Sequence, residues 1–109
     1  MDEFLSVLQQ HIDIVGEITD KMENGENYFD ELQGYLPPLN QMITEIFELI
    51  NNPQNRLDVN REFILQVLND IVYGMEQEDR VFLLDVLRYG LLEIYYYIGT
   101  ELQSEDSYE

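Results

Sequence analysis

One apolar seam in the middle of the chain constrains the fold more than any other feature. Its members alternate at spacings of three and four, which places them on one face of a helix; they are Phe29, Leu32, Leu36, Leu39, Ile43, Ile46 and Ile50. Pro37 and Pro38 lie within it, and each lacks a backbone donor and crowds the carbonyl four residues earlier. Because the apolar phase continues across them, both halves face one core. We therefore predict one helix kinked near residue 36, or two nearly collinear helices at 27–36 and 38–51.

Three further segments have helical spacing. Residues 2–23 carry Leu5, Leu8, Ile12 and Val15; a third segment carries Ile64, Val67, Leu68, Ile71 and Met75; residues 80–102 carry Leu84, Leu87, Leu91, Ile94, Ile98 and Leu102. Gly25 suits a left-handed position after the first helix, and Asp58 or Asn60 can cap the third. The links are short and no segment has the alternation of a strand. We therefore predict an all-α fold, an antiparallel up-and-down four-helix bundle whose second helix is kinked or broken at Pro37 and Pro38.

The bundle accounts for nearly the whole chain. Residues 1–102 are predicted to form a single helical-bundle domain. The segment 103–109 lacks an apolar pattern, so we predict a disordered acidic tail there.

The charge of the chain limits the partners that it can have. Five Lys and Arg residues against 23 Asp and Glu give a net charge of −18, which repels nucleic-acid backbones and anionic membranes. There is no cysteine, the N-terminus MDEF is acidic, and no apolar run reaches the length of a membrane span. We therefore expect a cytoplasmic protein with no direct nucleic-acid binding and no membrane association.

The sequence has few residues that carry chemistry. His11 is the only histidine and lies near the apolar face of the first helix, where we expect a partly buried, hydrogen-bonded side chain rather than a base or ligand. There is no Glu-x-x-His pair for a di-metal bundle and no glycine-rich nucleotide loop. We predict no catalytic residue, no cofactor and no metal site, and so no enzyme.

A fragment of a calcium-loop pattern does not change that prediction. Oxygen-bearing or turn-forming residues fall at four of its positions: Asp20, Asn24, Gly25 and Glu31. Met22 occupies a position that needs an oxygen ligand. A turn between two helices explains the same residues.

Three consecutive tyrosines, residues 95–97, indicate a second face on the last helix. At about 100° per residue, Tyr95 and Tyr97 lie on the two edges of the core, with hydroxyls that reach toward water, whereas Tyr96 points outward. Phe82 and Tyr89 precede Tyr96 at steps of seven and share its side, with Leu92 near the edge of this stripe. Three interpretations remain. The proline-containing segment or the tail covers the stripe, or Phe82, Tyr89, Leu92 and Tyr96 bind a protein partner or a second copy, or the exposure of these residues has no function.

Part of the chain resembles a known group of proteins. The residues that carry the resemblance are YFDELQGYLPPLNQMITEIFELI and LNDIVYGMEQEDRVFLLDVLRYGLLEIYYY, the latter with Met75-Glu76, an acidic turn, Asp79, the run Phe82-Leu83-Leu84, Asp85, Leu87 and Tyr89. They are similar to a loosely defined group of small, uncharacterised, acidic helical-bundle proteins of bacteria. In size and layout the chain is also similar to flagellar export chaperones. The resemblance implies a role in holding a protein partner.

Two functional hypotheses follow. The first is a non-enzymatic protein-binding helical bundle, a chaperone, adaptor or homodimeric module that uses the aromatic stripe of the last helix. The alternative is an acidic inhibitor or nucleic-acid mimic whose carboxylates bind a basic partner surface; its association should weaken steeply as salt rises.

Overall fold

The structure is a computed structural model that describes the backbone of residues 2–107 and the side chains of residues 3–103. Within that range all regular secondary structure is helical. The helices are α1 (Asp2–Glu23), α2 (Phe29–Asn51), α3 (Arg61–Glu76) and a last continuous run made of α4 (Arg80–Val86), the π-helical segment η1 (Leu87–Leu91) and α5 (Leu92–Ser107). The prediction of an all-helical chain with four helical segments is confirmed.

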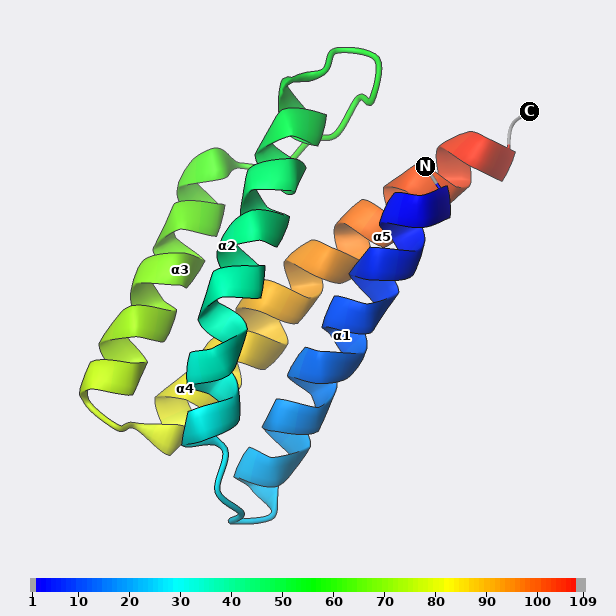
Figure 1. Ribbon diagram of the computed structural model, residues 1–109. Coiled ribbons are helices and arrows are strands. Elements are labelled where there is room, and N and C mark those ends of the chain that lie inside the picture. The colour runs from blue at the N-terminus through cyan, green and yellow to red at the C-terminus, as the bar shows by residue number, and fades with distance from the viewer. Residues whose placement is uncertain (1, 108–109) are drawn as a thin grey trace.

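The chain reverses direction at each of the three connections, so that the start of α1 and the end of α5 lie at the same end of the molecule (Figure 1). The closest backbone neighbours from separate helices are α3 with α4 and α1 with α5, whereas α1 and α2 approach one another less extensively. The molecule is elongated, with extents of 45 × 24 × 21 Å. The long last helix therefore forms the common support against which α1 and α3 pack.

The turns are built as the sequence predicts. Gly25 has φ +74°, and the backbone N–H of Glu26 donates to the carbonyl of Lys21, which closes a Schellman motif at the end of α1. The Asn60 side chain accepts from the N–H of Glu62 at 2.8 Å and caps α3. The carboxylate of Asp79 caps α4 in the same way.

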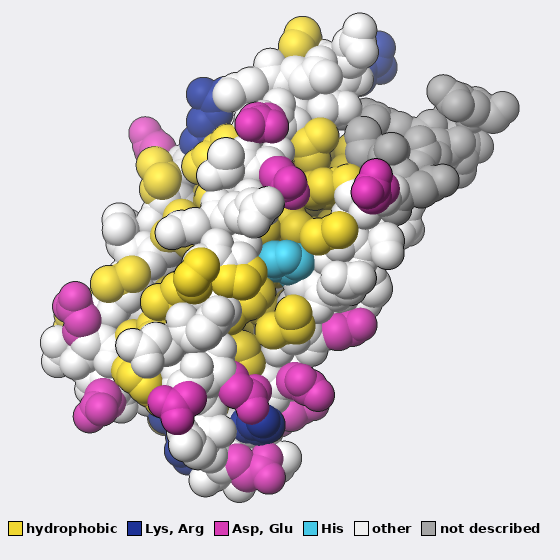
Figure 2. All heavy atoms as spheres, in the orientation of Figure 1, with side chains coloured by type: hydrophobic (Ala, Val, Ile, Leu, Met, Phe, Trp, Pro, Cys, Tyr) yellow, Lys and Arg dark blue, Asp and Glu magenta, His cyan; other side chains and the backbone are white. Residues whose placement is uncertain are grey.

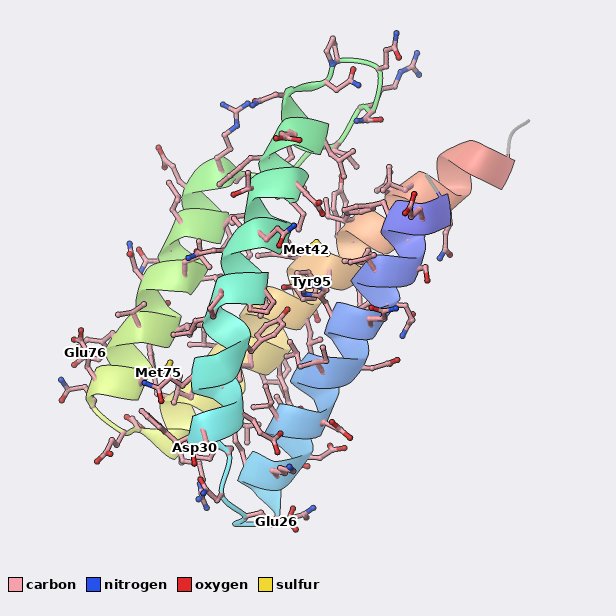
Figure 3. All side chains as sticks on the ribbon, viewed as in Figure 1. Glu26, Asp30, Met42, Met75, Glu76 and Tyr95 are labelled. Carbon is pink, nitrogen blue, oxygen red and sulfur yellow. The ribbon has the colours of Figure 1, made fainter. Side chains whose placement is uncertain are left out.

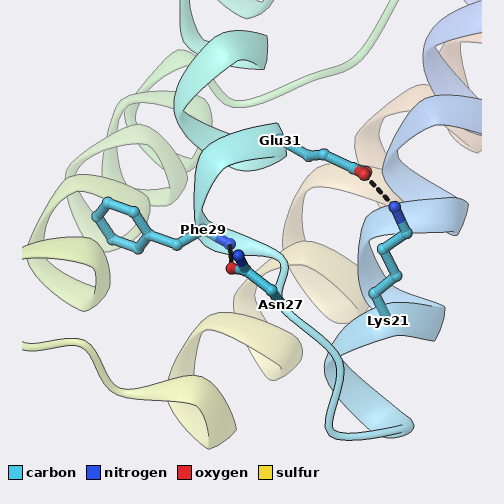
Figure 4. A network of polar contacts seen from close by, with 4 residues as sticks. All are labelled: Lys21, Asn27, Phe29 and Glu31. Atoms are coloured by element: carbon cyan, nitrogen blue, oxygen red, sulfur yellow. Dashed lines mark hydrogen bonds and ion pairs between the residues drawn. The ribbon is translucent and has the colours of Figure 1, made fainter.

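The connection between α1 and α2 is held by two polar contacts (Figure 4). The Asn27 side chain accepts a hydrogen bond from the N–H of Phe29, and the Lys21 ammonium of α1 forms an ion pair with the Glu31 carboxylate of α2. These contacts fix the entry of α2 beside the end of α1.

The helix α2 continues across its prolines. It is assigned as one helix from Phe29 to Asn51, with Pro37 and Pro38 inside it. Of the two predicted alternatives, the split into separate helices is therefore wrong. Both prolines are exposed, as are Gln33 and Gly34, whose carbonyls lose their helical donors. Water can reach those carbonyls, which is why the helix continues past the prolines.

The last helix contains a feature that the sequence pattern did not predict. Residues Leu87–Leu91 form a π-helical turn, which places one extra residue in the coil. The phase of the buried face shifts across it. Before the turn, the buried residue is Leu83, and the predicted seam residue Leu84 is only half-buried. Leu91, the last residue of the turn, and Leu92, the first residue after it, are both buried.

Two glycines explain why the last helix lies so close to α3. A Cβ on Gly90 would lie 3.0 Å from Val67, and one on Gly74 would lie 2.8 Å from the Leu83 side chain. Side chains larger than hydrogen would hold the helices apart at both points. The close approach, together with the π-turn, determines which face of the last helix is buried.

The end of the last helix differs from the prediction of a disordered tail from residue 103. The helix α5 continues to Ser107, so residues 103–107 are helical, and residues 108–109 lie outside the described range. Once a helix is nucleated, adding residues costs little, and glutamine and glutamate are good helix formers.

Candidate functional site

The structure separates the four residues predicted to bind a partner. Tyr89 and Tyr96 are exposed, at 69% and 52% of their full surface. Leu92 retains only 8% and belongs to the core, and Phe82 is half-buried. The predicted stripe therefore contains two accessible aromatic residues rather than four accessible apolar ones.

Phe82 and Tyr96 contact different neighbours. The Phe82 ring meets Tyr73 of α3 edge-on, with centroids 5.9 Å apart. Tyr96 instead borders a hollow of about 170 Å³ that it shares with Leu5 and Ile12 of α1. The π-turn lies between them, and a wheel drawn at 100° per residue cannot represent the extra residue.

The three consecutive tyrosines have three different environments. Tyr96 points outward, as predicted. Tyr97 is half-buried, and its hydroxyl oxygen accepts the backbone N–H of Asp58 at 3.0 Å, which ties the α2–α3 connection to α5. Tyr95 is fully buried. Its predicted position at the core edge, with the hydroxyl toward water, is wrong, because the π-turn rotates this part of the helix inward.

The Tyr95 hydroxyl is part of a buried polar chain. It lies 2.7 Å from the hydroxyl of Tyr35, which lies 2.6 Å from Nδ1 of His11. Figure 3 shows Tyr95 and Met42 in the interior of the molecule, between α2 and α5. These hydrogen bonds between His11, Tyr35 and Tyr95 thus join α1, α2 and α5. His11 is half-buried and hydrogen-bonded, as the sequence predicted.

Burial shifts the pKa values of His11, Tyr35 and Tyr95. It lowers the pKa of His11 below its ordinary value, opposed in part by the nearby Glu45 carboxylate. It raises the pKa of Tyr35 to about 12, opposed in part by the hydrogen bond from Tyr95, and raises the pKa of Tyr95 further. At neutral pH all three groups are therefore uncharged.

One tautomer of neutral His11 gives every hydroxyl proton of this network an acceptor. With the ring proton on Nε2, Nδ1 accepts from the Tyr35 hydroxyl, which accepts in turn from the Tyr95 hydroxyl. Every member then has a partner. Among the described residues, no buried side-chain nitrogen or oxygen lacks one. Sequence reasoning assigned no role to Tyr35, which directly precedes the seam residue Leu36 and is itself buried.

A hollow of about 490 Å³ lies in front of His11, between α1 and α2. It is lined by Glu3, Phe4, Val7, His11, Pro38, Gln41, Met42 and Glu45. Figure 2 shows the histidine at the surface among hydrophobic side chains. The hollow combines an apolar floor with two carboxylates.

A second apolar depression runs between α2 and α3. Two adjoining hollows, of about 120 and 240 Å³, share Leu36 and Val72. Val72 and Leu65 of α3 are each 50% exposed. The predicted stripe on the last helix is therefore not the only place where apolar side chains reach the surface.

The described residues offer no assembled metal site. No group of three or more His, Cys, Asp or Glu side chains in that part of the chain is placed to hold a metal ion. In the segment with the calcium-loop fragment, Glu31 pairs with Lys21.

Among the helices described, none is long and apolar enough to cross a membrane. Comparison with protein-family models, with curated proteins and with solved structures finds no match for this chain. The resemblance to export chaperones stays a prediction, and functional inference depends on the surfaces and networks described above.

Proposed function

We propose that the protein is a non-enzymatic protein-binding module, a chaperone, adaptor or homodimeric unit, built on an antiparallel up-and-down four-helix bundle. The observation that supports the proposal best is the exposure of Tyr89 and Tyr96 on the last helix. Tyrosine is enriched at the centres of protein interfaces, because its ring offers a large rigid contact area and its hydroxyl a hydrogen bond.

The two tyrosines have no evident task within the described fold. Tyr95 and Tyr97 each make a hydrogen bond to another element, whereas Tyr89 and Tyr96 keep most or about half of their surface for solvent. They are seven residues apart, about 10 Å along a helix axis, a spacing that one partner surface can span. The revised surface therefore consists of Tyr89 and Tyr96 and no longer includes Phe82 or Leu92.

The test compares the tyrosine pair of the last helix with a single exposed tyrosine of α3. In pull-downs from an extract of the source organism, Tyr89→Ser with Tyr96→Ser should remove proteins that the unchanged chain captures. Tyr73→Ser is the matched control, since Tyr73 of α3 is 56% exposed. Light scattering on the purified chain tests the homodimer. Unfolding curves should be nearly unchanged, because exposed substitutions cost little. If the double substitution changes neither the proteins captured in the pull-down nor the self-association of the purified chain, this surface is ruled out.

The acidic alternative is favoured by a separate observation. Among the described residues, the ion pairs are Lys21 with Glu31 and Arg88 with Glu23, while the chain has 23 acidic residues. Most carboxylates therefore have no cation of their own and are available to a basic surface. Association of this kind should weaken steeply between low and high salt, whereas a contact centred on tyrosines should persist.

A further inference from the structure

The depression between α2 and α3 is formed by the seam of α2 and the outer edge of α3. The residues that line its two hollows are Phe29, Gln33, Leu36, Leu39 and Asn40 of α2 and Leu68, Ile71, Val72, Met75 and Glu76 of α3. We name this depression the α2–α3 groove. Most of its lining is apolar, and its floor is continuous because Leu36 and Val72 border both hollows.

The groove exists because α3 packs closely on a different neighbour. Gly74 and Gly90 let α3 and the last helix approach until no Cβ would fit between them. The α2 side of α3 has no such contact, and its closest backbone neighbours among the described elements are α4 and η1. Val72 lines both hollows and remains half exposed.

Charge indicates what the groove can accept. Glu76 lines its lower hollow, and Asp30, exposed in the first turn of α2, follows the groove residue Phe29. Figure 3 shows Asp30, Met75 and Glu76 at the same end of the molecule, and in Figure 2 acidic side chains border the hydrophobic band at that end. A second copy of the chain would bring another net charge of −18 to this rim. A basic partner is attracted instead.

We propose that the α2–α3 groove binds an amphipathic helix of a partner protein, one with apolar side chains on one face and Lys or Arg beside them. Two apolar residues spaced three or four apart would enter the two hollows, as in other helix-in-groove complexes. The flanking cations would lie against Asp30 and Glu76. Arg61 begins α3 at the other end, so the cations belong at the Asp30 and Glu76 end. This surface is separate from Tyr89 and Tyr96.

The probe is a fluorescein-labelled peptide of about 16 leucines and lysines, roughly four turns, with its leucines spaced three and four apart. A scrambled peptide of the same composition has no apolar face. We expect fluorescence anisotropy to give binding at least about tenfold tighter for the amphipathic peptide.

Two matched substitutions separate the groove from general attraction. Val72→Asp puts a carboxylate in the groove, and Val81→Asp puts one on α4, where Val81 is 71% exposed and does not line the groove. Both variants gain a negative charge, which by itself strengthens attraction to a cationic peptide. We expect Val72→Asp to weaken binding about tenfold or more, Val81→Asp to leave it unchanged or slightly strengthened, and the Tyr89→Ser, Tyr96→Ser double variant to leave it unchanged.

Three results would overturn the proposal. Equal binding of the scrambled peptide would show that charge alone attracts the probe. Undiminished binding by Val72→Asp would place the peptide elsewhere. A concentration-dependent dimer that Val72→Asp dissociates would show that a second copy occupies the groove. None of these results bears on the tyrosine surface, whose variants are different.

Discussion

At the scale of single residues, the hydrogen-bond chain of His11, Tyr35 and Tyr95 is the most specific arrangement in the core. Because each hydroxyl donates toward His11, the three side chains do not have the same number of hydrogen-bond partners. Tyr35 is bonded on both sides, whereas Tyr95 is bonded only to Tyr35 and is fully buried. An unpaired buried hydroxyl costs more than a hydroxyl that is simply removed, because the lost partner is not replaced by water.

The two tyrosines should therefore respond differently to loss of the hydroxyl. Tyr95→Phe leaves Tyr35 bonded to His11, so we expect a loss of about 1 kcal/mol in the free energy of unfolding. Tyr35→Phe leaves the Tyr95 hydroxyl without a partner, and we expect about 1–3 kcal/mol. Urea unfolding of both single variants and the double variant measures the difference. A double variant more stable than Tyr35→Phe would support this order; equal losses in the two single variants would contradict it.

The same hydrogen-bond network makes the free energy of unfolding depend on the charge of His11. Protonated histidine donates from both nitrogens, so Tyr35 would have to turn and donate to Tyr95, whose own proton would then lack an acceptor. The folded protein therefore resists protonation, consistent with a His11 pKa held below 6.5 by burial. The Glu45 carboxylate, which lines the hollow in front of the ring, acts in the opposite direction without reversing the shift.

The sign of the pH effect follows from that pKa. The unfolded chain binds the His11 proton near pH 6.5 and the folded chain only at lower pH, so this contribution is complete above 6.5 and is lost as pH falls toward the folded pKa. We expect the free energy of unfolding of the unchanged chain, relative to His11→Gln, to fall as the pH drops from about 6.5 toward the folded pKa of His11. The comparison removes the carboxylate titrations that both chains share. An NMR titration with the imidazole pKa at or above 6.5 would contradict the assignment.

At the scale of helices, the approach of α3 to the last helix depends on small residues. Gly74→Ala improves helix propensity, but the new Cβ would lie 2.8 Å from Leu83, a side chain with no exposed surface to move into. We expect a net loss of about 1–3 kcal/mol in the free energy of unfolding. Gly16→Ala of α1, with no other atom within 4 Å, should instead gain about 0.5–1 kcal/mol. Thermal unfolding of both variants gives the comparison, and a stabilised Gly74→Ala would disprove the tight contact.

The close contact between α3 and the last helix explains which parts of the fold could be predicted from the sequence. The seam of α2 was predicted well, because a helix with regular phase needs only local spacing: Leu32, Leu39, Ile43 and Ile46 are all buried. The last helix was predicted less well. Its π-turn lies where Gly90 meets Val67 of α3, a contact between distant segments that spacing along one helix does not contain. Leu92 and Tyr95 were misplaced for this reason.

The exposed surfaces were also predicted where they depend on one helix and missed where they depend on two. Tyr96 was placed outward correctly, since it lies far from any seam position under either phase. The α2–α3 groove was not found, because it depends on the spacing between two helices rather than on the pattern of either one. A sequence signal was present in Val72, an apolar groove residue that stands outside the seam of α3.

At the scale of the whole molecule, the net charge of −18 opposes compactness. The two ion pairs are surface contacts with partly exposed side chains, and such pairs contribute little. Salt should therefore screen more repulsion than attraction. We expect the urea midpoint of unfolding to rise from about 20 mM to about 500 mM NaCl. An uncharged osmolyte is no substitute for the salt in this test, since it strengthens burial without screening charge.

The same salt series distinguishes the proposed modes of binding, because added salt should raise the stability of the fold and weaken association that depends on charge. If carboxylates alone attract the partner, association should weaken over the range in which the midpoint rises. The groove combines apolar burial with the carboxylates of Asp30 and Glu76. Affinity for the amphipathic peptide should therefore fall at first and then level off, whereas affinity for the scrambled peptide should continue to fall. Parallel declines for both peptides would contradict an apolar contribution from Leu36 and Val72.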